Sequence, residues 1–256
     1  MMIRAWLILA DILLHLFLFL SLIFFYTSSP LKKHITKEEY MAVKRALTQT
    51  KFIDENLSEA LVLIAAKVGD PVFIRIFKAE SLLEVWIRSG AEYQHLKDYF
   101  ICAYSGTLGP KLQEGDRQAP EGFYKVKKYQ LNPNSKYHLS FNLGFPNQYD
   151  REHNRTGSFL MVHGSCVSDG CYAMTDEKIE EIYMLVERAL KRGQKYVQVH
   201  AYPFRMTEEN MTLYTESKLY DFWVNLKEGY DYFEAEHLPP HIKDEDGLYM
   251  INESSE

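Results

Sequence analysis

The 256-residue sequence lacks most of the signatures that identify a function at first sight. It has no G-x-G-x-x-G turn after an expected strand and no P-loop, so nothing suggests nucleotide chemistry. No internal repeat and no block of like charge stands out. The formal net charge of -6 argues against a nucleic-acid-binding protein. The length and the apolar share predict one folded domain, or one domain with appendages.

Cysteine is also scarce, with three in the chain, and two of them lie close to a histidine in residues 161–175, M-V-H-G-S-C-V-S-D-G-C-Y-A-M-T. The apolar run 159–162 predicts a short buried strand, and two glycines mark the turn that follows. A thiol is a good nucleophile as the thiolate, and a nearby imidazole can take its proton. His163 and Cys171 are therefore the candidate catalytic pair.

Three interpretations of this stretch compete. In the first, His163 is a hydrogen-bonded core residue and both cysteines are small buried hydrophobes. In the second, His163, Cys166 and Cys171 hold a structural zinc, although no second ligand pair at a standard spacing accompanies them. In the third, which we favour, Cys171 is a covalent nucleophile and a tight turn at Gly170 aims backbone N–H groups at the developing oxyanion.

These residues resemble the signature of the L,D-transpeptidases with a YkuD-type catalytic domain, in which H-G and a variable stretch precede S-x-G-C. In this chain the signature consists of His163-Gly164, Ser168, Gly170, Cys171 and Met174. An upstream region resembles the family's G-x-x-x-x-x-T-P-x-G-x-Y pattern, with alanine in place of threonine: Ser105-Gly106, Gly109, Lys111, Gly115 and Ala119-Pro120-x-Gly122-x-Tyr124. The resemblance covers roughly residues 71–203, and the combination is specific.

Two departures from the family pattern point to one branch. The loop between His163 and Cys171 is short, and Ala173 stands where the family usually has an arginine. Both features resemble the YafK-type branch, which is associated with hydrolysis of the bond between Braun's lipoprotein and peptidoglycan. The missing arginine is expected to contribute to substrate binding, and Arg205 is a candidate substitute.

The resemblance implies that Cys171, deprotonated by His163, attacks the carbonyl on the L-centre of diaminopimelate in a stem peptide. N–H groups around Gly170 and Cys171 are the expected oxyanion donors, and the carbonyl of Gly164 or Ser165 is expected to orient the imidazole. Transfer of the acyl group to water, which we favour, gives a hydrolase that detaches wall-bound lipoprotein. Transfer to an amine gives a transpeptidase that makes crosslinks or attaches lipoprotein. This chemistry needs no metal or other cofactor.

Two alternatives lie outside this class: a zinc-dependent amidase that uses His163 and Cys166, and a non-catalytic module that binds the cell wall.

Five residues are candidates for substrate binding: Ser168, Tyr149, Arg151, Arg205 and Lys111. Lys111 belongs to the polar loop 108–118, and Tyr149 and Arg151 belong to the loop 146–157. In a wall enzyme such loops bind the carboxylates of the stem peptide. The simpler interpretation is that their charges are solvated.

Residues 5–26 are almost continuously apolar and long enough to cross a bilayer as a helix. We favour an uncleaved anchor over a cleaved signal peptide because Pro30 would follow the candidate cleavage site. We therefore expect a periplasmic domain that is held at the inner membrane through residues 5–26, or secreted after cleavage. Its expected partners are peptidoglycan stem peptides and wall-linked lipoprotein, with no nucleic acid.

An odd number of cysteines in an oxidising compartment predicts one disulfide and one free thiol. A bridge between Cys102 and Cys166 is the hypothesis that leaves Cys171 free.

The expected fold is mainly β with flanking helices (α+β). We expect an anchor and linker over residues 1–33, a helical segment over 34–70, a catalytic domain over 71–203, and a helical extension with a loose tail over 204–256. Helices are predicted over 36–50, over 56–68 and after Thr175, and strands over 72–77, 82–88, 93–104, 122–129, 137–144 and 196–202. Such short strands argue for a sandwich or a partly closed barrel, and the resemblance implies a β-sandwich.

Overall fold

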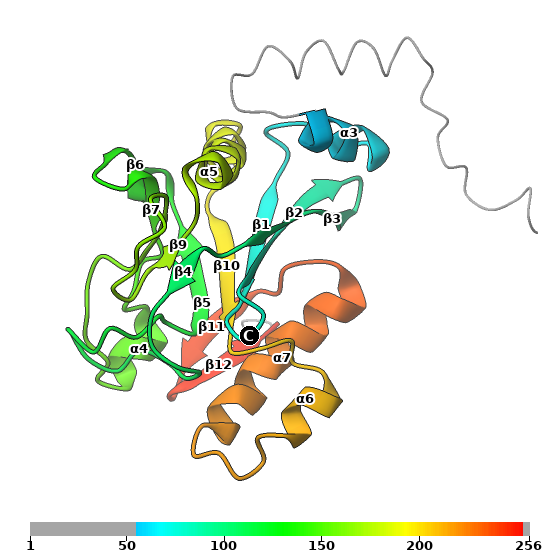
Figure 1. Cartoon of the computed structure of the whole chain (residues 1–256). Coiled ribbons are helices and arrows are strands. Elements are labelled where there is room, and N and C mark those ends of the chain that lie inside the picture. The colour runs from blue at the N-terminus through cyan, green and yellow to red at the C-terminus, as the bar shows by residue number, and fades with distance from the viewer. Residues whose placement is uncertain (1–54, 253–256) are drawn as a thin grey trace, which may run out of the picture. The chain divides into compact units, whose positions relative to one another are not determined.

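Two five-stranded sheets organise the part of the chain that this computed structural model describes, residues 55–252 (Figure 1). The first sheet contains, in spatial order, β3 (Glu92–Phe100), β2 (Leu82–Ser89), β1 (Val72–Phe77), β10 (Val197–Tyr202) and β5 (Gly122–Val126). The second contains β4 (Ala103–Tyr104), β9 (Tyr172–Ala173), β8 (Met161–His163), β7 (His138–Asn142) and β6 (Leu131–Ser135). The β1–β10 and β8–β9 pairs are parallel, and the other pairs are antiparallel.

Five α-helices and one 3-10 turn accompany the sheets in this region. They are α3 (Glu55–Leu63), η1 (Lys128–Gln130), α4 (Gln148–Glu152), α5 (Asp176–Lys191), α6 (Glu208–Thr212) and α7 (Tyr220–Glu236). The fold is therefore α+β, as the sequence predicts.

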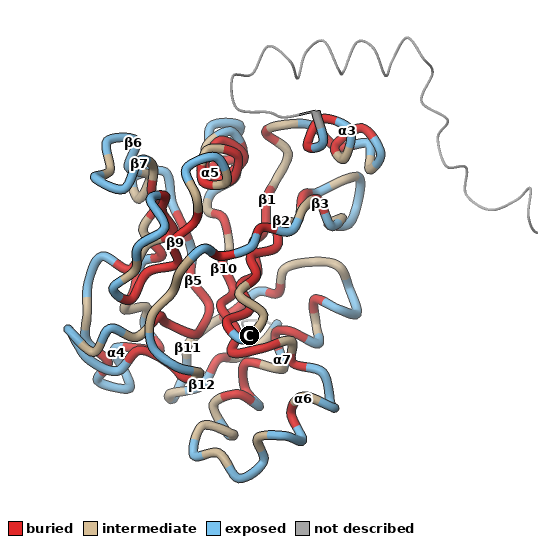
Figure 2. Tube along the Cα trace, in the orientation of Figure 1, coloured by how far each residue is buried: buried red, intermediate tan, exposed pale blue. Residues whose placement is uncertain are grey.

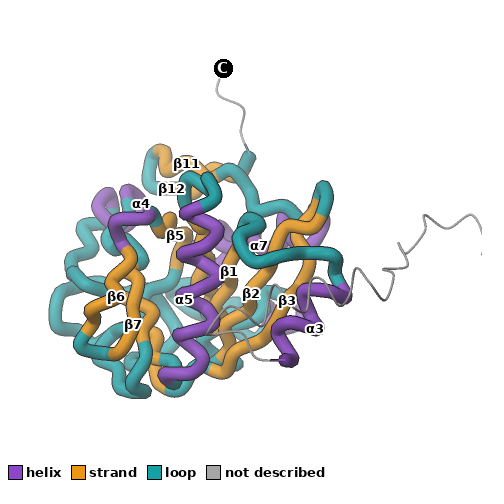
Figure 3. Tube along the Cα trace, turned by 90° about the horizontal axis from the view of Figure 1, so that it is seen from above, coloured by secondary structure: helices purple, strands orange, loops and turns teal. Residues whose placement is uncertain are grey.

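Strand β1 is the centre of the first sheet and is buried on both faces, with five apolar residues and Arg75, which is ion-paired with Glu84 and Glu234. All six residues of V-F-I-R-I-F are buried, as a strand covered on two sides requires (Figure 2). Helix α5 packs against β1 and β10 of the first sheet and against β7 and β8 of the second, and Figure 3 shows it between them. Its N-cap is Thr175, whose hydroxyl accepts the Lys178 amide, as predicted.

The opposite face of the first sheet is covered by aromatic residues of α7 and of the chain's last strands. One cluster of buried side chains joins Phe77, Phe123 and Tyr202 of the sheet to Trp223 and Tyr230 of α7. Rings from several segments pack together here and are removed from water, which stabilises the fold.

The C-terminal region differs from the expectation of a loose tail. Strands β11 (Ile242–Glu245) and β12 (Leu248–Ile251) form an antiparallel hairpin, in which Tyr249 is buried. Asp246 and Gly247 connect them with φ of 51° and 73°, the positive values that a two-residue hairpin turn requires. The Asp-Gly pair is the signal that the sequence interpretation missed.

Other boundaries shift modestly. The expected helix 56–68 ends at Leu63, and the expected strand 93–104 is divided into β3 and β4 with Cys102 between them. Strand β6, L-N-P-N-S, was not predicted because its polar composition is typical of a loop. The predicted helix 36–50 and the predicted membrane segment 5–26 lie outside the described residues, and none of the helices described within 55–252 is long and apolar enough to span a bilayer.

Candidate active site

His163 is the last residue of β8 and its side chain is 1% exposed. Its Nδ1 lies 2.7 Å from the carbonyl oxygen of Gly164. A carbonyl only accepts, so Nδ1 carries the proton and Nε2 keeps the free lone pair that a general base needs. Burial lowers the pKa of His163, which keeps the imidazole neutral near pH 7. The Tyr137 ring lies 4.6 Å from the imidazole, centroid to centroid, and covers it.

Cys171 immediately precedes β9, and its thiol is buried. The Sγ atom donates to the Phe159 carbonyl at 3.6 Å. Burial raises the pKa of this thiol above its ordinary value, and the Asp169 charge adds to the rise, while the Met161 amide and the Lys111 charge oppose it. The free protein therefore holds a neutral thiol rather than a thiolate.

The pKa of the thiol is raised even though α5 begins a few residues after Cys171 and a helix N-terminus near a thiol lowers its pKa. The first turn of α5 is engaged elsewhere: the Asp176 carboxylate accepts the Ser165 amide at 2.8 Å. That carboxylate also offsets the positive end of the helix dipole. Desolvation of the thiol is thus the dominant effect.

The register of the parallel strands β8 and β9 indicates how the His163 and Cys171 side chains are oriented relative to each other. Val162 pairs with Tyr172 and His163 pairs with Ala173. Side chains alternate along a strand, so Cys171, two residues before Ala173, is expected on the same face as His163. The register therefore predicts that the two candidate residues share one face of the second sheet.

The turn between the candidate pair is tied down by a disulfide. Cys102 and Cys166 are bonded, with 5.2 Å between their Cα atoms, and Cys171 is a free cysteine. The zinc interpretation needs the Cys166 thiolate as a ligand, and the disulfide removes it. Within residues 55–252, no group of three or more histidine, cysteine or acidic side chains is placed to hold a metal.

Gly164 and Ser165 were alternative sources of the carbonyl that orients the imidazole, and the structure places Gly164 there. Ser165 is exposed. A β-carbon at Gly164 would lie 2.6 Å from Asp176 Oδ1 and 3.0 Å from both the Ile179 side chain and the Tyr137 carbonyl. The tight packing explains why glycine suits the position after the histidine.

Gly170 adopts φ of 95°, which favours glycine, and its amide donates to Ser105 Oγ at 2.6 Å. As an oxyanion donor, this amide would have to exchange the Ser105 hydroxyl for the substrate oxygen. The Ser168 hydroxyl donates to the Cys171 carbonyl at 2.7 Å and lies 3.4 Å from Ser105 Oγ. Ser105 and Ser168 thus shape the turn in front of the thiol, a role for Ser105 that its place in the upstream motif did not reveal.

Among the predicted substrate-binding residues, Lys111 lies close enough to the thiol to act on its pKa. Its side chain is 4% exposed and forms an ion pair with Asp116. It also packs against Gly157, where an added β-carbon would lie 2.5 Å from Lys111 Cε. Lys111 is therefore a fixed charge beside the site rather than a solvated loop residue.

Three other predicted substrate-binding residues have different partners. Tyr149 is 3% exposed and stacks on Tyr249 with 4.1 Å between ring centroids, so its ring belongs to the core. Arg205 Nη2 is bonded to Glu84 Oε1 at 2.6 Å, which commits the proposed substitute cation to a buried carboxylate. Arg151 is exposed and donates to the Pro146 carbonyl. The Tyr149 and Arg205 pairings join segments distant in sequence, and no local sequence pattern predicts them.

Ala173 is fully buried in β9, which lies between β4 and β8. Neither neighbouring strand leaves solvent access there for the long charged side chain that the family usually carries.

Comparisons with known proteins find a matching family and similar proteins. The family described as the L,D-transpeptidase catalytic domain, YkuD, matches residues 71–200. A protein of Escherichia coli K12 named "Putative L,D-transpeptidase YafK" is 51% identical over 185 residues, which span 72% of this chain and 75% of that protein. The protein of the same name from Escherichia coli O157:H7 matches equally.

Solved structures show a weaker likeness. The helical cell shape determining protein Pgp2 (K307A mutant) of Campylobacter jejuni is 20% identical with a TM-score of 0.44, over 68% of this chain and 64% of that one. Bd1075 of Bdellovibrio bacteriovorus is 18% identical with a TM-score of 0.38, over 64% of this chain and 58% of that one.

Proposed function

Because the chain belongs to the L,D-transpeptidase family with a YkuD-type catalytic domain, we propose that it is a cysteine-dependent peptidoglycan-modifying enzyme whose nucleophile is Cys171. The observation that carries the proposal is the hydrogen bond from His163 Nδ1 to the Gly164 carbonyl. This bond fixes the tautomer in which Nε2 can accept the thiol proton. Parallel pairing of β8 with β9 supports a common face for both side chains.

The first half of the proposed reaction starts from the neutral pair. As Cys171 Sγ attacks the carbonyl on the L-centre of diaminopimelate, its proton passes to His163 Nε2 and a tetrahedral oxyanion forms. Collapse breaks the amide bond, and the imidazolium gives its proton to the departing amine. The product is a thioester on Cys171. Backbone amides of the turn at Gly170 and Cys171 are the candidate oxyanion donors, with Ser105 as the group that releases the Gly170 amide.

In the second half, we favour water as the acceptor. His163 removes a proton from water, the hydroxide attacks the thioester, and Cys171 leaves as the thiol, so that the stem peptide ends in a carboxylate. The support is Ala173, a buried small residue where the family usually has arginine, together with the engagement of Arg205 by Glu84. Without a free cation at these positions, a carboxylate-bearing acceptor strand has fewer partners.

We further propose that the scissile amide joins the stem peptide to a wall-bound lipoprotein, and that the domain works in the periplasm. The support is the identity to the YafK proteins and the apolar segment 5–26. An enzyme of this kind must lie on the side of the membrane where peptidoglycan is found.

The test uses the full-length protein and sacculi that carry bound lipoprotein, with Cys171→Ala as the matched control. Released muropeptides are analysed by mass. Release of a lipoprotein-derived remnant that depends on Cys171 supports the hydrolase. New diaminopimelate crosslinks or exchanged terminal D-amino acids would make the protein a transpeptidase. No change that depends on Cys171 would refute the proposal.

A further inference from the structure

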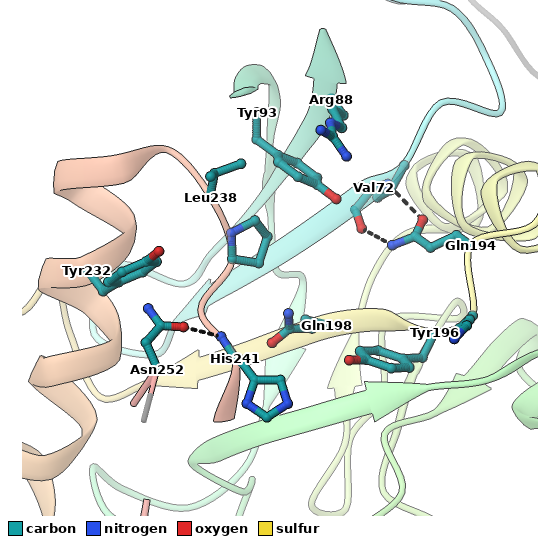
Figure 4. A pocket seen from close by; sticks show the side chains of 12 residues that line it. Val72, Arg88, Tyr93, Gln194, Tyr196, Gln198, Tyr232, Leu238, His241 and Asn252 are labelled. Carbon is teal, nitrogen blue, oxygen red and sulfur yellow. Dashed lines mark hydrogen bonds between the residues drawn. The ribbon is translucent and has the colours of Figure 1, made fainter. Parts of the chain in front are cut away.

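Two hollows lie on the first sheet, away from the candidate active site. The first, of about 530 Å³, is lined by residues of β1, β2, β10 and the segment after α7, and Figure 4 shows its side chains. The second, of about 470 Å³, is lined by residues of β5, η1, α4 and the start of β11. Gln198 of β10 lines both, so the two hollows adjoin. Neither His163 nor Cys171 lines either one.

The charge of these walls is opposite to that of the chain. Six basic residues line the two hollows, and all six are exposed: Arg88, Lys195, His241, Lys125, Lys127 and Arg151. None of the six forms an ion pair within residues 55–252, although the formal net charge is -6. Asp244 is the one acidic residue among the lining residues. The five lysine and arginine side chains among them carry positive charge without a carboxylate partner, and such cations gathered in a concave surface attract an anionic ligand.

The walls also carry aromatic rings that can receive a sugar. Tyr196 and Tyr232 are partly exposed in the first hollow, and Tyr129 is 80% exposed in the second. Figure 4 shows Tyr93 and Tyr196 directing their phenol oxygens into the space. Lys125 Nζ lies 5.3 Å from the centroid of the Tyr196 ring, so a cation of the second hollow lies beside an aromatic ring of the first. Exposed tyrosines offer an apolar face for sugar rings and a hydroxyl for their polar rims.

We propose that the two hollows form one groove that binds a peptide-free stretch of a glycan strand of the wall polymer, with sugar rings on the tyrosines and the free lactyl carboxylates of muramic acid on the basic side chains. The choice of polymer rests on the proposed function. A lone small ligand would fill one hollow, whereas adjoining hollows with cations spread over β2, β5, α4 and the segment before β10 fit an extended anionic chain.

One backbone hydrogen bond connects the wall of the second hollow to the segment beside the candidate nucleophile. Leu143 and Pro146 line the second hollow, and the Leu143 amide donates to the Leu160 carbonyl at 2.9 Å. The preceding residue, Phe159, accepts the hydrogen bond of the Cys171 thiol. Because the glycan strands of the wall are joined into one polymer, a peptide-free stretch held in the groove would keep the stem peptides of neighbouring residues close to the protein and raise their local concentration.

The test measures binding of the full-length protein, as Cys171→Ala so that nothing is turned over, to three probes. Peptide-free muramic glycan strands carry sugars and free carboxylates, N-acetylglucosamine oligomers carry sugars alone, and soluble stem peptides carry carboxylates alone. The groove variant is Arg88→Glu/Lys195→Glu. The matched control is Lys67→Glu/Lys218→Glu, which makes the same charge change at exposed residues outside both hollows.

We expect the muramic strands to bind best, and the groove variant to weaken that binding roughly tenfold or more while the control stays close to the parent. In the protein with Cys171 restored, turnover of a soluble disaccharide-peptide should be unchanged by the groove variant. Equal binding by groove and control variants would overturn the proposal, as would soluble stem peptides that bind as tightly as the strands. If the groove variant weakens binding but no turnover depends on Cys171, the proposed function is refuted and the proposed glycan-binding groove is supported.

Discussion

Removing the Cys102–Cys166 disulfide should destabilise the protein strongly, because the bridge closes a long loop. The two residues are 64 apart in sequence. The loop-entropy relation for a closure of this length gives about 4 kcal/mol of stabilisation, through restriction of the unfolded chain. For a chain of this size, that corresponds to a fall in melting temperature of roughly 10 °C.

The perturbation is Cys102→Ser/Cys166→Ser, and the assay is urea unfolding of the full-length protein beside its parent, with and without reductant. Reductant should lower the stability of the parent to that of the double variant and leave the variant unchanged. Cys171→Ser is the control, since it removes a thiol and keeps the bridge. Thiol titration of the unfolded, unreduced parent should count one thiol per chain. A loss below about 1 kcal/mol, or three thiols in the unreduced parent, would refute the reasoning.

Three further predictions follow from the burial of single side chains: Cys171, His200 and Ala173. Burial raises the pKa of the Cys171 thiol, so its alkylation at pH 7 should be slower than that of an ordinary cysteine. The alkylation rate should still increase with pH above about pH 8.5. A rate that levels off below pH 7 would show a preformed thiolate. Burial holds the pKa of His200 well below its ordinary value, so its stabilising contribution is present above about pH 6.5 and is lost on acidification by about 1.4 kcal/mol per pH unit. Urea titrations from pH 7 to 5 should show a flatter dependence for His200→Gln, and an identical slope would contradict this. Ala173→Arg, which restores the family's usual residue at a fully buried position, should cost about 3 kcal/mol or more in unfolding free energy, and a variant as stable as the parent would show that the second sheet has room for it.

The sequence predicted the elements whose patterns are local. The apolar run of β1, the Thr175 cap of α5 and the strand over residues 196–202 are each encoded in a few adjacent residues, and the structure agrees with them, although β10 is buried almost throughout rather than at alternate residues. The histidine and cysteine motif could be found in the same way because its spacing is short. The Asp246-Gly247 turn is also a local signal, and its hairpin could have been predicted from it.

The residues whose predicted roles differ from their positions in the structure are held by partners that are distant in sequence. Tyr149 lies in a polar stretch, yet it is buried because Tyr249, a hundred residues later, stacks on it. Arg205 is bound by Glu84 from a strand of the first sheet. The thiol pKa shows the same limitation: a nearby helix N-terminus is visible in the sequence, whereas the desolvation that outweighs it depends on the whole packed site.

The most direct test of the account is whether Cys171 becomes acylated. The full-length protein would be mixed with a muropeptide carrying the scissile amide, quenched in acid within seconds, digested, and mapped by mass. The account predicts an acyl adduct on the peptide that contains Cys171, absent in Cys171→Ala and accumulating far more slowly in His163→Ala. Turnover that proceeds with no adduct on Cys171, or that survives in Cys171→Ala, would contradict it.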